Sequence, residues 1–187
     1  DQITQTPVVS IEETRAHTLL GASDFLVLGF PTYHAAPSES MRTFIEGLPR
    51  YEKQKYAFAF STCGLYPANA LRIFAKACRD KNIIVLHSAA YRAPATDGAL
   101  LAPGVKCFHR FPKDLCGKVQ VDVNIAWRLV CHPPCAVRLP PFKWYAIFNY
   151  PNKMVGQQYY KPQIHVLAPH CTGCGLCGEQ GPQCCFD

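Results

Sequence analysis

Short continuous apolar runs alternate with helically spaced apolar residues along the first half of this chain. The runs cover residues 25–30, 56–60 and 82–87, and each has the length of one strand. A continuous apolar run is typical of a strand that is buried on both faces of a parallel sheet. Because the segments beside the runs have helical spacing, the pattern predicts three strand–helix cycles of an open parallel α/β sheet with helices on both faces.

Each predicted helix carries a signal for its start or for its buried face. Ser10 and Glu13 form a capping box, in which the glutamate reaches back to the serine amide, and this helix is expected to end near Leu20. Pro67 suits the first turn of the third helix. The apolar faces of the second and third helices consist of Met41, Phe44, Ile45 and Leu48, and of Leu71, Phe74, Ala75 and Cys78.

The second half of the chain is less regular. One more helix is predicted within residues 108–130. A linker is predicted over residues 131–160, because four prolines lie between positions 131 and 141. The expected organisation is therefore an α/β domain over residues 1–130, the linker, and a small cysteine-rich unit over residues 161–187.

Composition narrows the class of protein. With 49% hydrophobic and 17% charged residues, the chain is expected to fold around a core rather than to stay disordered. Its 19 lysines and arginines outnumber 13 aspartates and glutamates, which gives a net charge of +6. Because the basic residues are scattered, no nucleic-acid site is predicted. The positive charge would favour an acidic redox partner protein. No apolar run reaches 18 residues, so no membrane span is expected. The chain opens with Asp1 and not Met, which indicates processing or a fragment.

Eleven cysteines are present, and five of them lie in the last seventeen residues. An odd count in a chain of this length argues against a secreted disulfide framework. Reduced thiols together with one metal cluster fit better and favour the cytoplasm.

The cysteines Cys171, Cys174 and Cys177 have the spacing C-x2-C-x2-C in the sequence CTGCGLC. This spacing lets one tight loop wrap an iron–sulfur cluster, so a 4Fe–4S cluster is predicted. The fourth ligand is missing unless Cys184 or Cys185 substitutes. Two alternatives stay open: a zinc knuckle completed by one of those two cysteines, or free surface thiols.

Two blocks give the chain a family resemblance. LGFPTYHAAPSESMRTFIEGLP and FSTCGLYPANALRIFAKAC resemble the third and fourth strand–loop–helix units of a flavodoxin-like domain. Together with YRAPATDG at residues 91–98 and CTGCGLC downstream, they make the chain similar to flavodoxin–ferredoxin fusion proteins over residues 7–110 and 160–182.

The resemblance implies an FMN site at the carboxyl ends of the strands. The first loop would offer Tyr33 to one face of the flavin ring, beside Thr32. The second loop would run along the reactive edge of the ring and comprises Thr62, Cys63, Gly64, Leu65 and Tyr66. The alternative for both tyrosines is plain packing on the end of the sheet, and Cys63 is interpreted as a small neighbour of the flavin and not as a nucleophile.

The chain also departs from the family at both ends. The phosphate loop that would follow a first strand is missing, so FMN is expected in a full-length protein and only weakly or not at all here. Without that first strand, residues 25–30 would form a bare hydrophobic edge. At the other end, position 181 before Pro182 is glycine where the family has cysteine. A truncation at both ends is therefore expected.

These features predict an electron carrier that passes single electrons between an iron–sulfur cluster and a flavin. No histidine pairs with a cysteine and an acid at a catalytic spacing, so no catalytic residue is assigned. Two other functions remain: a zinc- or other metal-binding interaction module, and a flavin/iron–sulfur oxidoreductase that transfers hydride.

Overall fold

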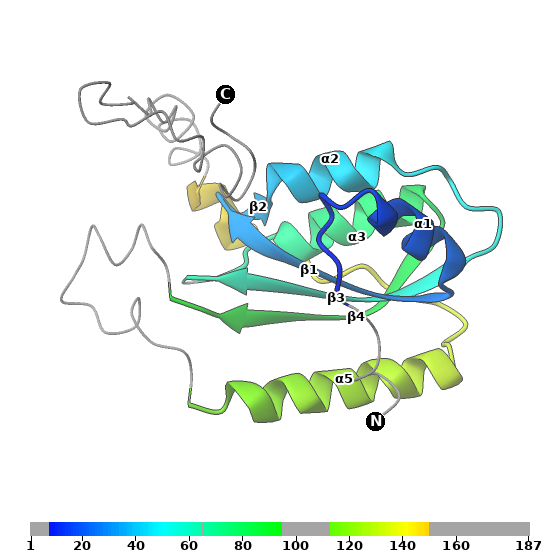
Figure 1. The fold of residues 1–187 in the computed structure, drawn as a ribbon. Coiled ribbons are helices and arrows are strands. Elements are labelled where there is room, and N and C mark those ends of the chain that lie inside the picture. The colour runs from blue at the N-terminus through cyan, green and yellow to red at the C-terminus, as the bar shows by residue number, and fades with distance from the viewer. Residues whose placement is uncertain (1–7, 65, 95–112, 150–187) are drawn as a thin grey trace, which may run out of the picture. The chain divides into compact units, whose positions relative to one another are not determined.

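The computed structural model describes residues 8–64, 66–94 and 113–149. These residues form an α/β fold around a mixed four-stranded sheet with the order β2-β1-β3-β4 (Figure 1). Strands β1, β3 and β4 are parallel, with Phe25 opposite Tyr56 and Lys55 opposite Ile83. The elements are α1 Arg15–Ala22, β1 Phe25–Tyr33, β2 Ala36–Pro37, α2 Glu39–Gly47, β3 Lys55–Cys63, α3 Ala70–Asp80, β4 Ile83–Arg92, α5 Leu115–Cys131 and the 3-10 helix η3 Trp144–Asn149.

The prediction of a wholly parallel sheet is wrong at one edge. Strand β2 occupies part of the predicted loop 31–37 and pairs antiparallel with the end of β1, where Thr32 lies opposite Pro37. The chain reverses through His34 and Ala35, whose φ angles of 48° and 65° are both in the left-handed region. Such a tight turn usually carries glycine or asparagine, so this sequence gives no signal for it.

The first core layer lies between the sheet and helices α1, α2 and α3. The Phe30 ring of β1 packs against the Phe74 ring of α3, with centroids 4.6 Å apart. The predicted apolar faces of the second and third helices are confirmed, because all of their members are buried: Met41, Phe44, Ile45, Leu48, Leu71, Phe74, Ala75 and Cys78. Periodicity alone therefore located this half of the core.

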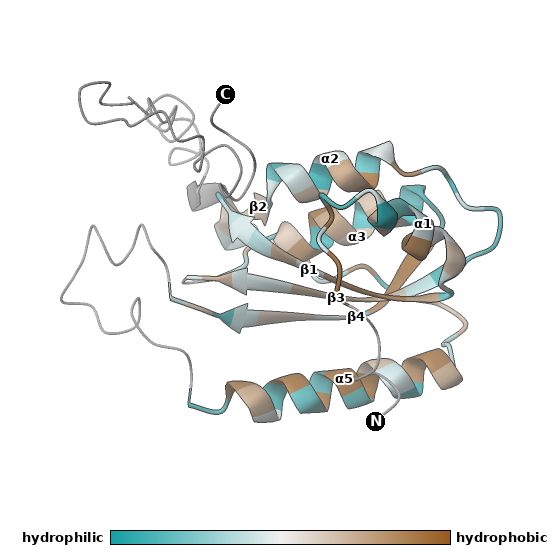
Figure 2. Ribbon diagram, viewed as in Figure 1, coloured by the Kyte–Doolittle hydropathy of each residue, from teal (hydrophilic) through white to brown (hydrophobic). Residues whose placement is uncertain are grey.

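Helix α5 lies on the opposite face of the sheet, so the predicted helix within residues 108–130 and the covering of both faces are confirmed (Figure 1). Its buried Ala126 belongs to a second cluster with Phe58 and Tyr91. A polar contact also joins this helix to β4. Asp122 pairs with His87 Nε2 at 2.7 Å and accepts a hydrogen bond from the Tyr91 hydroxyl at 2.9 Å. Figure 2 shows apolar and polar residues interleaved along this helix.

Strand β1 is not buried on both faces, contrary to the expectation for residues 25–30. Leu26, Leu28 and Phe30 are buried, whereas Val27 is 50% exposed. The Phe60 ring of β3 packs directly against Gly29 of β1, so that a Cβ atom added at Gly29 would lie 2.2 Å from the ring. Among the described residues, β2 is the strand that pairs with the outer side of β1, and it does so only at Thr32 and Tyr33.

One bond of the predicted capping box forms, from the Ser10 amide to Glu13, but the Ser10 hydroxyl accepts from the Glu12 amide and the helix begins later than predicted. The Ser10 amide donates to Glu13 Oε1 at 3.0 Å, and this hydrogen bond lowers the pKa of Glu13. Residues 11–14 make a turn, and α1 begins at Arg15 and ends at Ala22. The bond between the Ser10 amide and Glu13 thus stabilises the turn that precedes the helix.

Two lysines cap helix ends at the amino edge of the sheet, opposite to the edge where the strands end. At the C-terminus of α1, Lys55 Nζ donates to the carbonyls of Gly21 and Ser23, both at 2.7 Å. At the C-terminus of α2, Lys81 Nζ donates to the carbonyls of Glu46 at 2.7 Å and Leu48 at 2.6 Å. A cation at a helix C-terminus satisfies terminal carbonyls and complements the helix dipole.

We expect Lys81→Met to lower the free energy of unfolding by about 1–2 kcal/mol, because two carbonyls lose their donor. Urea denaturation followed by circular dichroism measures this change. Lys53→Met is the matched control. Lys53 pairs with Asp24 at 3.0 Å on the surface with 78% of its side chain exposed, and its replacement should change the stability by less than about 0.5 kcal/mol. Equal losses in both variants would contradict the capping role.

Candidate functional site at the carboxyl edge of the sheet

The parallel strands bring the two predicted site loops to the same edge. Thr32 and Tyr33 lie at the end of β1, and Thr62 and Cys63 lie at the end of β3. The register places Pro31 opposite Thr62, so the two strand ends are direct neighbours. We call this side of the sheet the carboxyl edge. Leu65 lies outside the described residues.

The two predicted aromatic residues are placed differently. Tyr33 is 61% exposed at the end of β1, which leaves its ring accessible to a ligand. Tyr66 is 39% exposed, and its ring meets the Tyr145 ring edge-on with centroids 5.6 Å apart. The Thr32 hydroxyl is buried and has no hydrogen-bond partner in the described part of the chain. Tyr33 is therefore the more accessible of the two rings.

Cys63 is a buried neutral thiol. Only 7% of the residue is exposed, and its Sγ lies 3.8 Å from the Tyr91 carbonyl, to which it donates. Burial raises the pKa of this thiol, and the nearby Arg92 offsets the effect only in part. Because a nucleophilic cysteine needs a lowered pKa and access, the chemistry of Cys63 fits a packing role better than attack.

Strand β4 supports the second loop from its other side. The Arg92 Nε donates to the Gly64 carbonyl at 3.3 Å, and the Ala93 amide donates to the Cys63 carbonyl at 3.0 Å. The backbone bond from Ala93 continues the β3–β4 ladder, and the Arg92 side chain adds a contact just beyond it. The end of β3 is therefore fixed by β1 on one side and by β4 on the other.

Residues in strained backbone conformations cluster in the segments that follow β1 and β3. The non-glycine residues with positive φ in the described ranges are His34, Ala35, Ala68 and Asn82. Three of these four follow β1 or β3, and Ala68 has a φ of 44°. Alanine gains nothing from this region, so such conformations persist only where their surroundings hold them, and they are frequent at ligand sites.

The sequence missed a segment that reaches this edge. Residues 137–145, here called the strap, fall within the predicted linker but run along α3. Asn69, Arg72 and Arg79 of that helix region bind the strap carbonyls of Lys143, Pro140 and Val137, at 3.2, 2.7 and 2.9 Å respectively. Leu139 packs on the first core layer. The four prolines of this region gave no signal for such docking.

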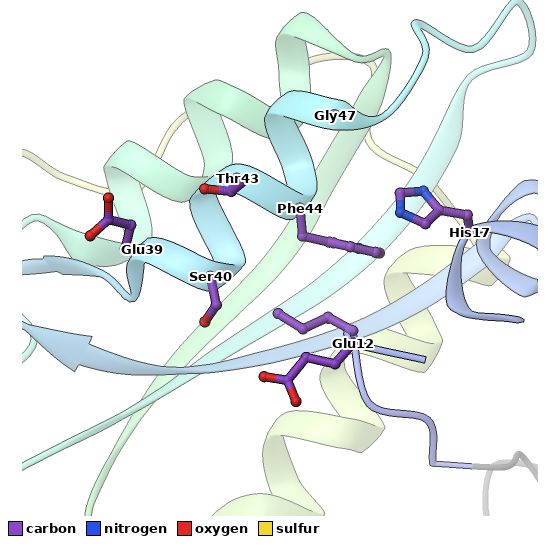
Figure 3. A pocket seen from close by; sticks show the side chains of 8 residues that line it. Glu12, His17, Glu39, Ser40, Thr43, Phe44 and Gly47 are labelled. Carbon is purple, nitrogen blue, oxygen red and sulfur yellow. The ribbon is translucent and has the colours of Figure 1, made fainter. Parts of the chain in front are cut away.

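None of the predicted site residues lines either of two open hollows on the described surface. One, of about 410 Å³, lies between the N-terminal turn and α2 (Figure 3). There the His17 and Phe44 rings lie 4.8 Å apart between centroids. The other, of about 450 Å³, lies beside the strap and is lined by Asn69, Phe142, Trp144 and Ala146.

The predicted cluster ligands Cys171, Cys174 and Cys177 lie outside the described residues, as do Cys184 and Cys185. Within the ranges that the structure covers, no group of three or more histidine, cysteine or acidic side chains could hold a metal ion. The cysteines described there are free thiols: Cys63, Cys78, Cys116, Cys131 and Cys135. No described helix is both long and apolar enough to cross a membrane.

Comparison with known proteins assigns this chain to no family. No protein-family model matches this chain, and no curated protein matches its sequence. The function must therefore be argued from the residues themselves.

Proposed function

We propose that this chain is an electron carrier, in which an FMN ring lies at the carboxyl edge and exchanges single electrons with a 4Fe–4S cluster held by Cys171, Cys174 and Cys177. The observation that carries the flavin half is the pairing of two loops at neighbouring strand ends, with the exposed ring of Tyr33 on one of them. The cluster half rests on the C-x2-C-x2-C spacing. The parallel order β1-β3-β4 supports a flavodoxin-like arrangement, in which a further strand would lie along the open side of β1.

The residues at the carboxyl edge suit the ring of a flavin. Tyr33 offers an aromatic face for stacking. The neighbouring Thr32 hydroxyl is buried and has no hydrogen-bond partner in the described part of the chain. The backbone around Gly64 can point amides at the polar edge of the ring. When bound, FMN supplies one-electron chemistry, while the protein provides position and electrostatics.

The carboxyl edge offers fewer binding groups to the phosphate of FMN than to its ring. Neither loop at the carboxyl edge contains the Thr/Ser-Gly-Thr type of sequence that cradles a phosphate at a helix start. Each charge-assisted hydrogen bond that is lost removes about 1.5–3 kcal/mol. We therefore expect ring recognition with weak overall affinity.

Titration of flavin fluorescence tests this proposal. The chain should bind FMN with a Kd above the micromolar range, and Tyr33→Ala should weaken binding about three- to tenfold, because a stacked aromatic pair contributes about 0.5–1.5 kcal/mol. Trp127→Ala is the control, since Trp127 is a 41%-exposed aromatic residue on α5. Sub-micromolar binding, or equal affinities of wild type and Tyr33→Ala, would contradict the proposed placement of the ring.

A further inference from the structure

The segment between the second loop of the proposed flavin site and α3 contains a residue in an unfavourable conformation. Ala68 has a φ of 44° and is only 6% exposed. An alanine side chain crowds its own backbone in this region, and asparagine or glycine would be the usual choice. Something outside the loop must therefore hold it, because a strained residue persists only when its surroundings determine its conformation.

The residue next to Ala68 is fastened to the strap by two hydrogen bonds. The Lys143 amide donates to Asn69 Oδ1 at 2.8 Å, and Asn69 Nδ2 donates to the Lys143 carbonyl at 3.2 Å. The Asn69 amide thus pairs with the strap backbone as a neighbouring strand would. Although Asn69 is the N-cap residue of α3, its side chain makes no capping hydrogen bond, so the strap is its partner.

Further contacts extend this attachment in both directions. Toward the loop, the Tyr145 ring meets the Tyr66 ring edge-on, at an interplanar angle of 79°. Away from the loop, Arg72 and Arg79 bind the carbonyls of Pro140 and Val137. From Val137 to Lys143 the strap contacts Arg79, Arg72 and then Asn69, so it runs antiparallel to α3. Its end therefore lies beside residues 66–69.

We propose that the strap is a positioning element of the flavin site: the Asn69–Lys143 pair and Tyr145 hold residues 66–69 in the strained form that supports the ligand-facing end of β3. This inference rests on the proposed flavin site. Neither Asn69 nor Tyr145 touches the ligand. They act through Ala68 and Tyr66, and loosening the strap lets the loop relax into conformations that bind FMN less well.

Flavin titration of matched variants is the first test. Asn69→Ala and Tyr145→Ala should each weaken FMN binding about tenfold, because a pair of hydrogen bonds or one aromatic contact is lost from the support of the loop. Tyr145→Phe should bind as the wild type does, since it keeps the ring. Arg79→Ala removes a strap bond at the far end and should leave the FMN affinity unchanged.

A rescue separates positioning from general destabilisation. Adding Ala68→Gly to Asn69→Ala should restore most of the FMN affinity, because glycine adopts positive φ without strain and needs no clamp. A purely structural role of Asn69 would not be rescued by this change. Unchanged binding in Asn69→Ala, or failure of Ala68→Gly to restore it, would overturn the proposal.

Hydrogen exchange decides the question even if FMN does not bind. The Ala70 amide donates to the Pro67 carbonyl at 3.0 Å and reports on the loop directly. Its exchange in the full chain should be about tenfold faster in Asn69→Ala than in Arg79→Ala. Equal exchange in the two variants would overturn the positioning role, whereas absence of FMN binding with the expected exchange would contradict only the flavin site.

Discussion

Replacing Cys174 by serine is expected to abolish cluster incorporation. Three thiolates from one loop hold the proposed 4Fe–4S cluster, and a serine hydroxyl is not deprotonated at neutral pH and is a poor ligand for this soft cluster. After anaerobic reconstitution, iron and acid-labile sulfide should fall to background levels in the Cys174→Ser protein. The same loss is expected for Cys171→Ser and Cys177→Ser.

The matched control for this experiment is Cys116→Ser. Cys116 is an exposed free thiol on α5 and belongs to no proposed ligand set. Its replacement should leave iron and sulfide at the wild-type level. Full retention of iron and sulfide in the Cys174→Ser protein would refute the cluster, and stoichiometric zinc in place of iron in the wild type would favour an interaction module instead.

The second large effect is expected at the contact between α5 and the sheet. Asp122→Ala removes the partner of both His87 and Tyr91, and it leaves the hydroxyl of the buried Tyr91 without its acceptor. Because each hydrogen bond to a charged group contributes about 1.5–3 kcal/mol, we expect the free energy of unfolding to fall by about 2–4 kcal/mol. Urea denaturation measures this loss.

Asn124→Ala is the control on the same helix. Asn124 is exposed and pairs only with Gln120 in the described chain, at 3.3 Å, so its replacement should cost less than about 0.5 kcal/mol. A loss in Asp122→Ala no larger than that of the control would contradict the structural role of this contact.

The same contact predicts a pH dependence. Burial, and then the hydrogen bond and charge of Asp122, raise the pKa of Tyr91. The folded state therefore holds this proton more tightly than the unfolded state does. The contribution of Tyr91 to stability should be complete below a pH of about 10 and should be lost as the pH rises through its folded pKa.

Local patterns predicted the helices and strands that have a buried face. The spacing of Phe74, Ala75 and Cys78 identified α3, and the run 82–87 identified the first half of β4. Such patterns reflect one-sided burial, which the sequence records directly. They fail where burial depends on a neighbour. Val27 in the apolar run of β1 shows this, because it stays 50% exposed although Phe25 of the same strand packs on the second core cluster.

Contacts between residues far apart along the chain, and strained backbone conformations, could not be predicted from the sequence. The Arg72–Pro140 hydrogen bond joins residues 68 positions apart, and nothing in the proline-rich segment indicates its partner. The turn at His34 and Ala35 lacks the usual glycine or asparagine, so β2 was not predicted. At the site, Tyr33 and Cys63 lie at neighbouring strand ends, but nothing in the sequence indicated that Tyr145 would contact Tyr66.

The most direct test of the electron-carrier proposal is the rate at which the cluster reduces the flavin. The full chain would be reconstituted anaerobically with iron and sulfide, mixed with FMN, reduced rapidly, and followed by the absorbance of the flavin. If both groups belong to one chain, the rate of flavin reduction should reach a plateau as FMN rises and should not depend on the protein concentration. A rate that grows in proportion to the FMN concentration without a plateau, or a cluster that leaves the flavin oxidised, would contradict the proposal.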